Sequence, residues 1–184
     1  MKNLKLKILC LFLLLLPLAQ FTTGCSHTKQ TEVKIGKYIV PPIVGWKRQL
    51  SHGKLISSVK YSIAEQNADI ALTFLVFNTP SGVTPPTTVS DLEQMAKMAA
   101  KTDADMKLTP KTLTSKPDQY KGLPAYTTET ESINGSEKVT ARFLDFTDGK
   151  NLYRFHLVIR QPTSSDAVTK TADQAWAKML ADLK

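Results

Sequence analysis

The sequence has little of the material from which most active sites and metal centres are built. Its 184 residues include two cysteines and three histidines, too few for a Cys/His metal site and few for the common pairs of nucleophile and base. It also lacks a Gly-rich phosphate loop, a G-x-S-x-G segment and an H-E-x-x-H segment. With eight glycines and ten prolines, it is neither collagen-like nor of low complexity. We therefore expect a globular domain with no catalytic, metal or cofactor site.

Long hydrophobic runs are confined to the start of the chain. Lys2, Lys5 and Lys7 precede an apolar stretch from Ile8 to Ala19, which is the pattern of a secretory signal peptide. The stretch is shorter than the roughly 20 apolar residues that span a bilayer, and no second run of this kind follows. We predict a signal peptide over residues 1–24 and no transmembrane helix after it.

Small residues precede a cysteine in the segment Phe21-Thr22-Thr23-Gly24-Cys25, which resembles a bacterial lipobox. The resemblance implies that Cys25 receives diacylglycerol and becomes the N-terminus after cleavage. Two or three acyl chains then hold the protein stably on a membrane. Thr22 stands where that family usually has Leu, and cleavage by ordinary signal peptidase, which leaves a free thiol, is the alternative.

The expected location is the bacterial cell envelope, on the outer side of the inner membrane or at the outer membrane. Ser26 follows the cysteine, and the absence of Asp at this position resembles an outer-membrane sorting signal. Residues 25–34 are polar after the cysteine and without periodicity, so they form a tether. A single globular domain over residues 35–184 then follows.

Basic residues outnumber acidic ones, 24 against 16, which gives a net charge of +8. Three of the basic residues belong to the predicted signal peptide. The sequence contains neither a recognition helix with clustered arginines nor a basic stretch interleaved with aromatic residues. Binding to nucleic acid is therefore not expected.

The first half of the domain alternates between strand-like and helix-like patterns. Alternating or continuous apolar residues predict strands over 37–40, around Trp46, over 55–63 and over 70–77. Ser90 and Glu93 have the spacing of a capping box. The helix that they begin carries an apolar stripe of Leu92, Met95, Ala96 and Ala99.

Two hairpins are predicted in the second half. Asn134-Gly135 predicts a type I′ turn between strands over 125–133 and 136–146, with Glu131 opposite Lys138. A three-residue loop over 147–149, with Gly149 left-handed in a bulge, then brings apolar faces together and sets Tyr153 opposite Phe143. The shared inner face consists of Tyr126, Phe143, Phe155, Leu157 and Ile159.

A second amphipathic helix over 165–183 ends the sequence. Its apolar side carries Val168, Ala172, Ala175, Trp176, Met179 and Leu183. Helices separated by antiparallel strands predict an α+β fold, an antiparallel sheet flanked by helices.

The order of these elements resembles the Mog1/PsbP-like superfamily and, within it, the DcrB-like bacterial lipoproteins. The segments that carry the resemblance are Lys121-Gly122-Leu123-Pro124-Ala125-Tyr126, Asp148-Gly149-Lys150-Asn151-Leu152-Tyr153 and Met179-Leu180-Ala181-Asp182-Leu183. The resemblance implies an α/β/α sandwich and a family of non-enzymatic accessory proteins that bind other proteins. It implies no individual binding residue and no cofactor.

The predicted register makes one surface a candidate partner face. It sets Arg142 opposite Arg154, with His156 nearby, and two facing arginines are unfavourable unless anions lie between them. Internal carboxylates, from Glu129, Glu131 or Asp173, are one explanation. The other is an anionic patch on a partner, bound by the arginines and made pH-sensitive by His156.

Two functions of different classes remain open. The first is a membrane-tethered, non-enzymatic module that binds another envelope protein, whose identity the sequence does not give. The alternative is a periplasmic carrier of a hydrophobic ligand, with a pocket bordered by Met95, Met98, Trp176 and Met179. An enzyme ranks third.

Overall fold

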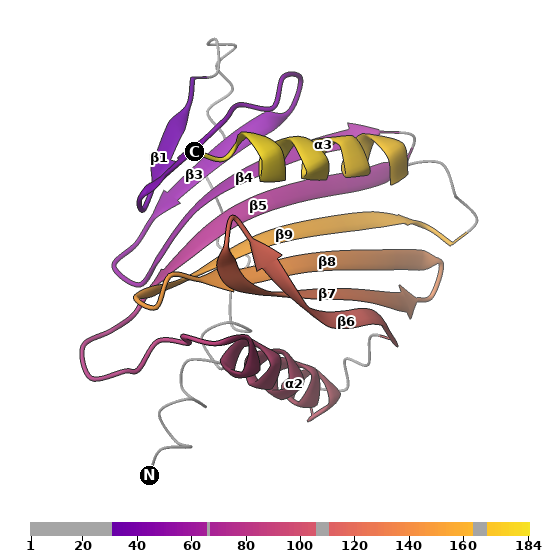
Figure 1. The fold of residues 1–184 in the computed structure, drawn as a ribbon. Helices are drawn as coiled ribbons and strands as arrows, with labels where there is room; N and C mark the ends of the chain where they lie inside the picture. The colour runs from indigo at the N-terminus through magenta and orange to yellow at the C-terminus, as the bar shows by residue number, and fades with distance from the viewer. Residues whose placement is uncertain (1–30, 66, 106–110, 164–168) are drawn as a thin grey trace.

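A seven-stranded antiparallel sheet lies between two helices, one on each face (Figure 1). The computed structural model describes residues 31–65, 67–105, 111–163 and 169–184. Across the sheet the strands are β3 (Lys47–His52), β4 (Ile56–Glu65), β5 (Ala68–Asn78), β9 (Asn151–Pro162), β8 (Glu137–Thr147), β7 (Leu123–Asn134) and β6 (Lys111–Tyr120). The helices are α2 (Val89–Asp105) and α3 (Thr169–Asp182). The predicted α+β fold, an antiparallel sheet flanked by helices, is confirmed.

The central strand β5 supplies both faces of the sheet with apolar side chains. Phe74 and Val76 belong to the core under α3, whereas Leu75 and Phe77 belong to the cluster under α2. Successive side chains of a strand point to opposite faces, so a continuous apolar run is what a strand covered on both sides requires. This explains the unbroken run that the sequence shows over 70–77.

The α3 face holds the larger core, which contains many aromatic rings. The rings of Phe146 and Tyr153 are 5.0 Å apart and stacked, and Phe155 meets Trp176 of α3 edge-on at 6.1 Å. Ala172, Ala175, Met179 and Leu183 of the predicted helical stripe are buried against this core. Val168 lies outside the described residues.

The α2 face holds a smaller cluster. Its buried members are Leu75, Phe77, Leu92, Met95, Tyr126 and Leu152. The predicted capping box is wrong by two residues: the Asp91 amide donates to Thr88 Oγ1 at 3.2 Å, and the Thr88 amide donates to Asp91 Oδ2 at 2.9 Å. Asp91 takes the role that was predicted for Glu93. It can do so because a carboxylate three residues after the capping residue can accept a hydrogen bond from the amide of the capping residue.

The β7–β8 hairpin has its turn one position later than predicted. Asn134 pairs with Glu137, which leaves Gly135-Ser136 as the loop. Of these two, only Gly135 has positive φ, at 62°, which suits a type II′ turn and not the type I′ turn that needs positive φ twice. Glu131 consequently lies opposite Thr140 and not opposite Lys138.

The register of β8 against β9 differs from the prediction by an odd number of residues. Tyr153 pairs with Phe146 and His156 pairs with Phe143, so the predicted pairing of Tyr153 with Phe143 is wrong. Gly149 is left-handed as predicted, at φ 81°. An odd shift moves side chains to the other face, and Phe143 therefore leaves the predicted inner face.

Strand β6 forms an edge of the sheet and was not predicted. All but two of its residues are exposed, so it has no alternation of apolar and polar residues. It is held by backbone pairing to β7, with an irregularity between Thr112 and Thr114, and it contains Pro117. Proline is tolerated in an edge strand because one side of such a strand needs no donor.

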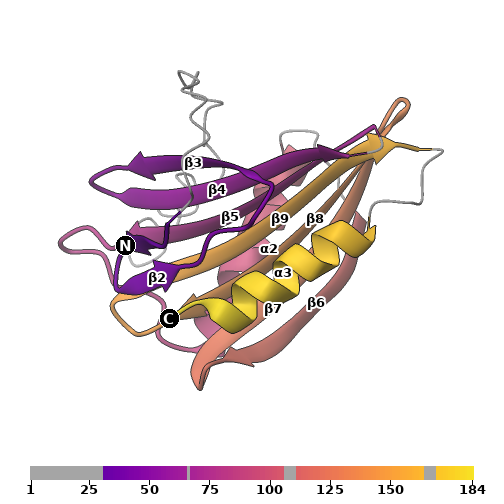
Figure 2. The same cartoon turned by 90° about the horizontal axis from the view of Figure 1, so that it is seen from above.

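A short hairpin of β1 (Val33–Ile35) and β2 (Tyr38–Val40) connects the start of the domain to its end (Figure 2). The backbone of Ile39 exchanges two hydrogen bonds with that of Lys184, at 2.7 and 3.1 Å. Val33 and Lys34, which the sequence assigned to the tether, belong to β1. The predicted signal peptide and Cys25 lie outside the described residues.

Candidate functional site

The three residues of the predicted partner face do not share a face. Arg142 pairs with Leu157 and lies on the α3 side, whereas Arg154 pairs with Asp145 and lies with His156 on the α2 side. The predicted pairing of Arg142 with Arg154 is therefore wrong, because it depended on the loop over 147–149.

Arg154 is fixed by a carboxylate on the neighbouring strand. Its Nε and Nη2 atoms donate to the two oxygens of Asp145 at 2.6 and 2.8 Å, and both side chains are largely buried. The guanidinium also lies 5.0 Å from the ring of Phe143. Such a forked pair is the strongest form of charge-assisted hydrogen bond, and it gives Arg154 a structural position.

His156 stacks on Phe143, with ring centroids 4.4 Å apart. The pKa of His156 is lowered to about 3. The main cause is removal of the imidazole from water, and the positive charges of Arg154 and Lys60 add to it. A pKa lowered in this way favours neutral His156 near pH 7 and gives no support to the pH-sensitive role, which stays a prediction.

Arg142 is paired from within the molecule. It donates to Asp173 of α3 at 3.0 Å and to Glu129 of β7 at 3.4 Å. Its guanidinium lies 5.7 Å from the ring of Trp176. Two of the three internal carboxylates considered from the sequence are thus its actual partners.

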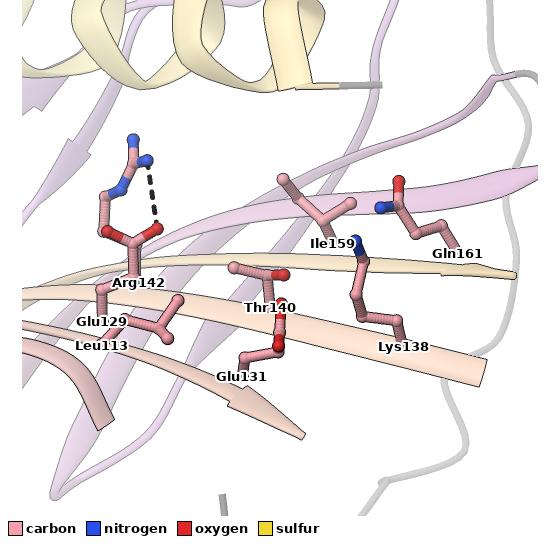
Figure 3. A pocket seen from close by; sticks show the side chains of 8 residues that line it. All are labelled: Leu113, Glu129, Glu131, Lys138, Thr140, Arg142, Ile159 and Gln161. Carbon is pink, nitrogen blue, oxygen red and sulfur yellow. Dashed lines mark hydrogen bonds and ion pairs between the residues drawn. The ribbon is translucent and has the colours of Figure 1, made fainter. Parts of the chain in front are cut away.

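A hollow of about 230 Å³ opens beside Arg142, on the α3 side of strands β6–β9 (Figure 3). Charged and polar side chains form most of its lining, with apolar Ile159 on the sheet and Leu113 at its edge. The polar members besides the Arg142 and Glu129 pair are Glu131, Lys138, Thr140 and Gln161. This hollow is the candidate functional site.

The register explains how these side chains meet. Thr140 pairs with Ile159, and Lys138 pairs with Gln161, so both neighbours on β9 project to the same side. Glu131 lies diagonally from Lys138 across β7 and β8. The sequence named Glu131 and Lys138 as a cross-strand pair, and Glu131 also as a candidate internal partner of the arginines. It missed Gln161, whose position after a run of alternating residues carries no signal of its own.

A second charged cluster fastens the N-terminal hairpin to the sheet. Asp148 accepts hydrogen bonds from Lys37 and Tyr153, each at 2.7 Å, and from the Asn151 amide at 2.9 Å. Burial alone would raise the pKa of Asp148, but these hydrogen bonds outweigh it and hold the pKa well below its ordinary value. With every oxygen occupied, the cluster is a structural fastening.

The predicted carrier pocket does not form. Met95 and Met98 pack in the cluster under α2, whereas Trp176 and Met179 pack in the core under α3. The sheet separates the two pairs, so they cannot border one pocket, and this prediction is wrong. Within the described residues no three His, Cys, Asp or Glu side chains gather in a way that could hold a metal ion.

The sheet between two helices, preceded by a short hairpin, is the fold of PsbP-like proteins. The solution structure of cyanobacterial PsbP (CyanoP) from Synechocystis sp. PCC 6803 resembles this chain with a TM-score of 0.52 at 13% identity, over 88% of this chain and 97% of CyanoP. At this identity the likeness concerns the fold alone. The predicted Mog1/PsbP-like fold is confirmed, and the closer DcrB-like resemblance stays a prediction.

Two further solved structures are more distant. PA94 from Pseudomonas aeruginosa, a protein of unknown function, has a TM-score of 0.47 at 13% identity over 80% of this chain and 91% of its own. LpqN, involved in cell envelope biogenesis of Mycobacterium tuberculosis, has a TM-score of 0.45 at 16% identity over 86% of this chain and 91% of its own. No protein-family model matches the sequence, and no curated protein matches it.

Proposed function

We propose that this protein is a membrane-anchored, non-enzymatic accessory lipoprotein of the bacterial cell envelope, which works by binding another envelope protein. The observation that carries the proposal is the position of Cys25. It follows a signal-peptide pattern and stands eight residues before β1 begins at Val33. A fully extended tether of this length reaches only about 28 Å, so the domain would stay close to the surface that holds its lipid.

The anchoring end and the hollow lie at different ends of α3. Glu32, just before β1, pairs with Lys184 at 2.8 Å, and thus the tether enters beside the C-terminal end of the helix. Asp173, which borders the hollow through Arg142, lies near the other end. Ten residues of helix separate these points by about 15 Å, which leaves the hollow accessible when the tether is held at a membrane.

No helix among the described residues is long and apolar enough to cross a bilayer. Attachment therefore depends, in this proposal, on acylation of Cys25. A lipid anchor of two or more chains is sufficient for stable attachment.

Metabolic labelling with a palmitate analogue tests the anchor. We expect wild type to be labelled and to partition into the detergent phase. Cys25→Ala should be unlabelled and remain in the aqueous phase. Cys10→Ala, which alters the only other cysteine, is the matched control and should behave as wild type. A free Cys25 thiol in the intact mass of the protein from cells would contradict the proposal.

Cross-linking in the native cells tests the binding role. We expect a specific envelope protein to be captured by wild type and lost when the domain is displayed on an unrelated anchor in another compartment. A reaction sustained by the purified protein would contradict the non-enzymatic part of the proposal.

A further inference from the structure

The hollow on the α3 side of the sheet is lined by a buried amide for which the described residues provide no hydrogen-bond partner. Gln161 is 9% exposed, and it lines the hollow together with Lys138 and Ile159 (Figure 3). Within the described part of the chain its side chain makes no hydrogen bond. A primary amide carries two donors and an acceptor, and buried polar groups are otherwise almost always satisfied. Among the described residues nothing satisfies the amide of Gln161, which faces the hollow.

The same hollow presents one charge of each sign that makes no ion pair among the described residues. Arg142 is neutralised by Asp173 and Glu129. Among the described residues, Lys138 and Glu131 make no ion pair with each other or with any other side chain.

Their separation follows from the register, since Glu131 lies opposite Thr140 and is a diagonal neighbour of Lys138. Diagonal neighbours lie about 7–8 Å apart. A small molecule that carries both charges can therefore contact the two side chains from between them.

We propose that the hollow binds a small zwitterion, a free amino acid or a dipeptide. Lys138 receives the carboxylate of the ligand, Glu131 accepts from its ammonium group, and the Gln161 amide bonds to the polar atoms between them. Ile159 supplies an apolar floor for the body of the ligand. A volume of about 230 Å³ is below the range of about 300–1,000 Å³ that is usual for drug-sized ligands, so the ligand is small.

This site goes beyond the proposed function and is independent of Cys25. The anchor could be absent while the hollow binds, and the hollow could be empty while the anchor holds. Labelling of Cys25 and ligand binding therefore fail separately.

Isothermal titration of the full-length protein, purified from membranes in detergent, tests the proposal. The probes are glycine, L-glutamate, L-lysine and L-alanyl-L-alanine, with acetate and methylammonium as singly charged controls. We expect saturable one-site binding of at least one zwitterion and binding of both controls weaker by at least about tenfold, because each control leaves one charge of the hollow unpaired.

Variants of the hollow locate the site. Lys138→Gln and Gln161→Leu should each weaken binding of the zwitterion by at least about tenfold. Lys116→Gln, on the exposed strand β6 and outside the hollow, is the matched control and should bind as wild type. Lys138→Gln should keep the thermal midpoint of wild type, so its result stands even if Gln161→Leu fails to fold.

Three results would overturn the proposal. The first is the absence of saturable binding for all four zwitterionic probes. The second is equal binding by Lys138→Gln and Lys116→Gln. The third is acetate or methylammonium binding as tightly as the zwitterion, which would show a site for a single charge.

Discussion

The two faces of the sheet hold an arginine in opposite ways. On the α2 face, Arg154 meets Asp145 in a forked pair in which the side chains are 15% and 7% exposed. On the α3 face, Arg142 reaches Asp173, whose side chain is 50% exposed, through a single contact at 3.0 Å. The first arrangement is closed, and the second borders the hollow. The difference shows which charge serves the fold and which borders a site.

The hydrophobic cores on the two faces also differ, in size and in what lies beside them. The α3 face is filled by a group of stacked and edge-on rings that includes Phe74, Phe146, Tyr153 and Phe155. Beyond this group of rings, the α3 face continues over β6–β9 as the hollow. The α2 face instead carries a smaller cluster, next to which the Arg154 pair is enclosed. A large rigid core on one half of a face can thus support an open polar site on the other half.

Removal of the closed pair should have the largest effect. Asp145→Ala leaves the guanidinium of Arg154 without its carboxylate, and loss of one partner from a buried pair costs about 3–5 kcal/mol. We expect the free energy of unfolding in urea to fall by this amount. A decrease below about 1 kcal/mol would show that the guanidinium of Arg154 is solvated when Asp145 is absent. The two faces would then not differ in how they hold an arginine.

The second-largest effect is expected from acid, which should lower the stability of the protein through His156 on the α2 face. His156 has its pKa lowered to about 3 from an ordinary 6.5. Between these values the unfolded chain binds a proton that the folded chain does not, so stability falls as pH falls below 6.5. The slope is about 1 kcal/mol per pH unit. Above pH 6.5 both states are neutral at this ring, and no effect is expected.

The variant His156→Leu tests this slope. Between pH 6.5 and about 4, where ordinary carboxylates begin to titrate, the urea midpoint of wild type should fall and that of His156→Leu should fall less. His52→Gln, an exposed histidine of β3, is the matched control and should keep the slope of wild type. Equal slopes in all three proteins would show that the pKa of the ring is not lowered and would contradict this prediction.

The start of α2 provides a smaller and sharper test. Thr88→Ala removes the oxygen that accepts from the Asp91 amide, and the loss of such a cap costs about 1 kcal/mol. Ser90→Ala, at the position that the sequence favours, should cost less than half of this. A larger loss of stability for Ser90→Ala than for Thr88→Ala, in thermal or urea unfolding, would support the predicted capping box of Ser90 and Glu93 instead.

The smallest effect is expected from the open pair on the α3 face. Asp173→Ala should lower the free energy of unfolding by at most about 1 kcal/mol, because Asp173 is half exposed and exposed pairs contribute little. Glu129 remains as a second partner of Arg142. A loss as large as that of Asp145→Ala would show that both faces hold their arginines in the same way.

Strands and helices could be predicted from periodicity, but the β8–β9 register could not. The prediction assumed that one face of the hairpin is apolar and the other polar, and it therefore kept Arg142 away from Tyr153. In the structure both faces are covered, and Arg142 shares a face with Phe155 because Asp173 and Glu129 satisfy it. A distant carboxylate on another helix leaves no trace in the local pattern.

The remaining failures have related causes. Strand β6 is held by its backbone, and its exposed side chains have no period to detect. The hollow depends on the pairing of Gln161 with Lys138, which is a property of the assembled sheet and not of any segment. The burial of a helix stripe, by contrast, follows from local spacing, and Ala172, Ala175 and Met179 lie where the sequence places them.

The outer edge of β6 bears on how densely copies of this protein can be displayed. In the proposed anchored form, copies would meet one another at high local concentration, and open strand edges are where sheets join into polymers. Here Pro117 has no N–H to give, the irregularity at Thr112 and Thr114 interrupts the ladder, and Lys111 and Lys116 bring like charges together. Crowded neighbours would therefore repel at this edge and remain separate molecules.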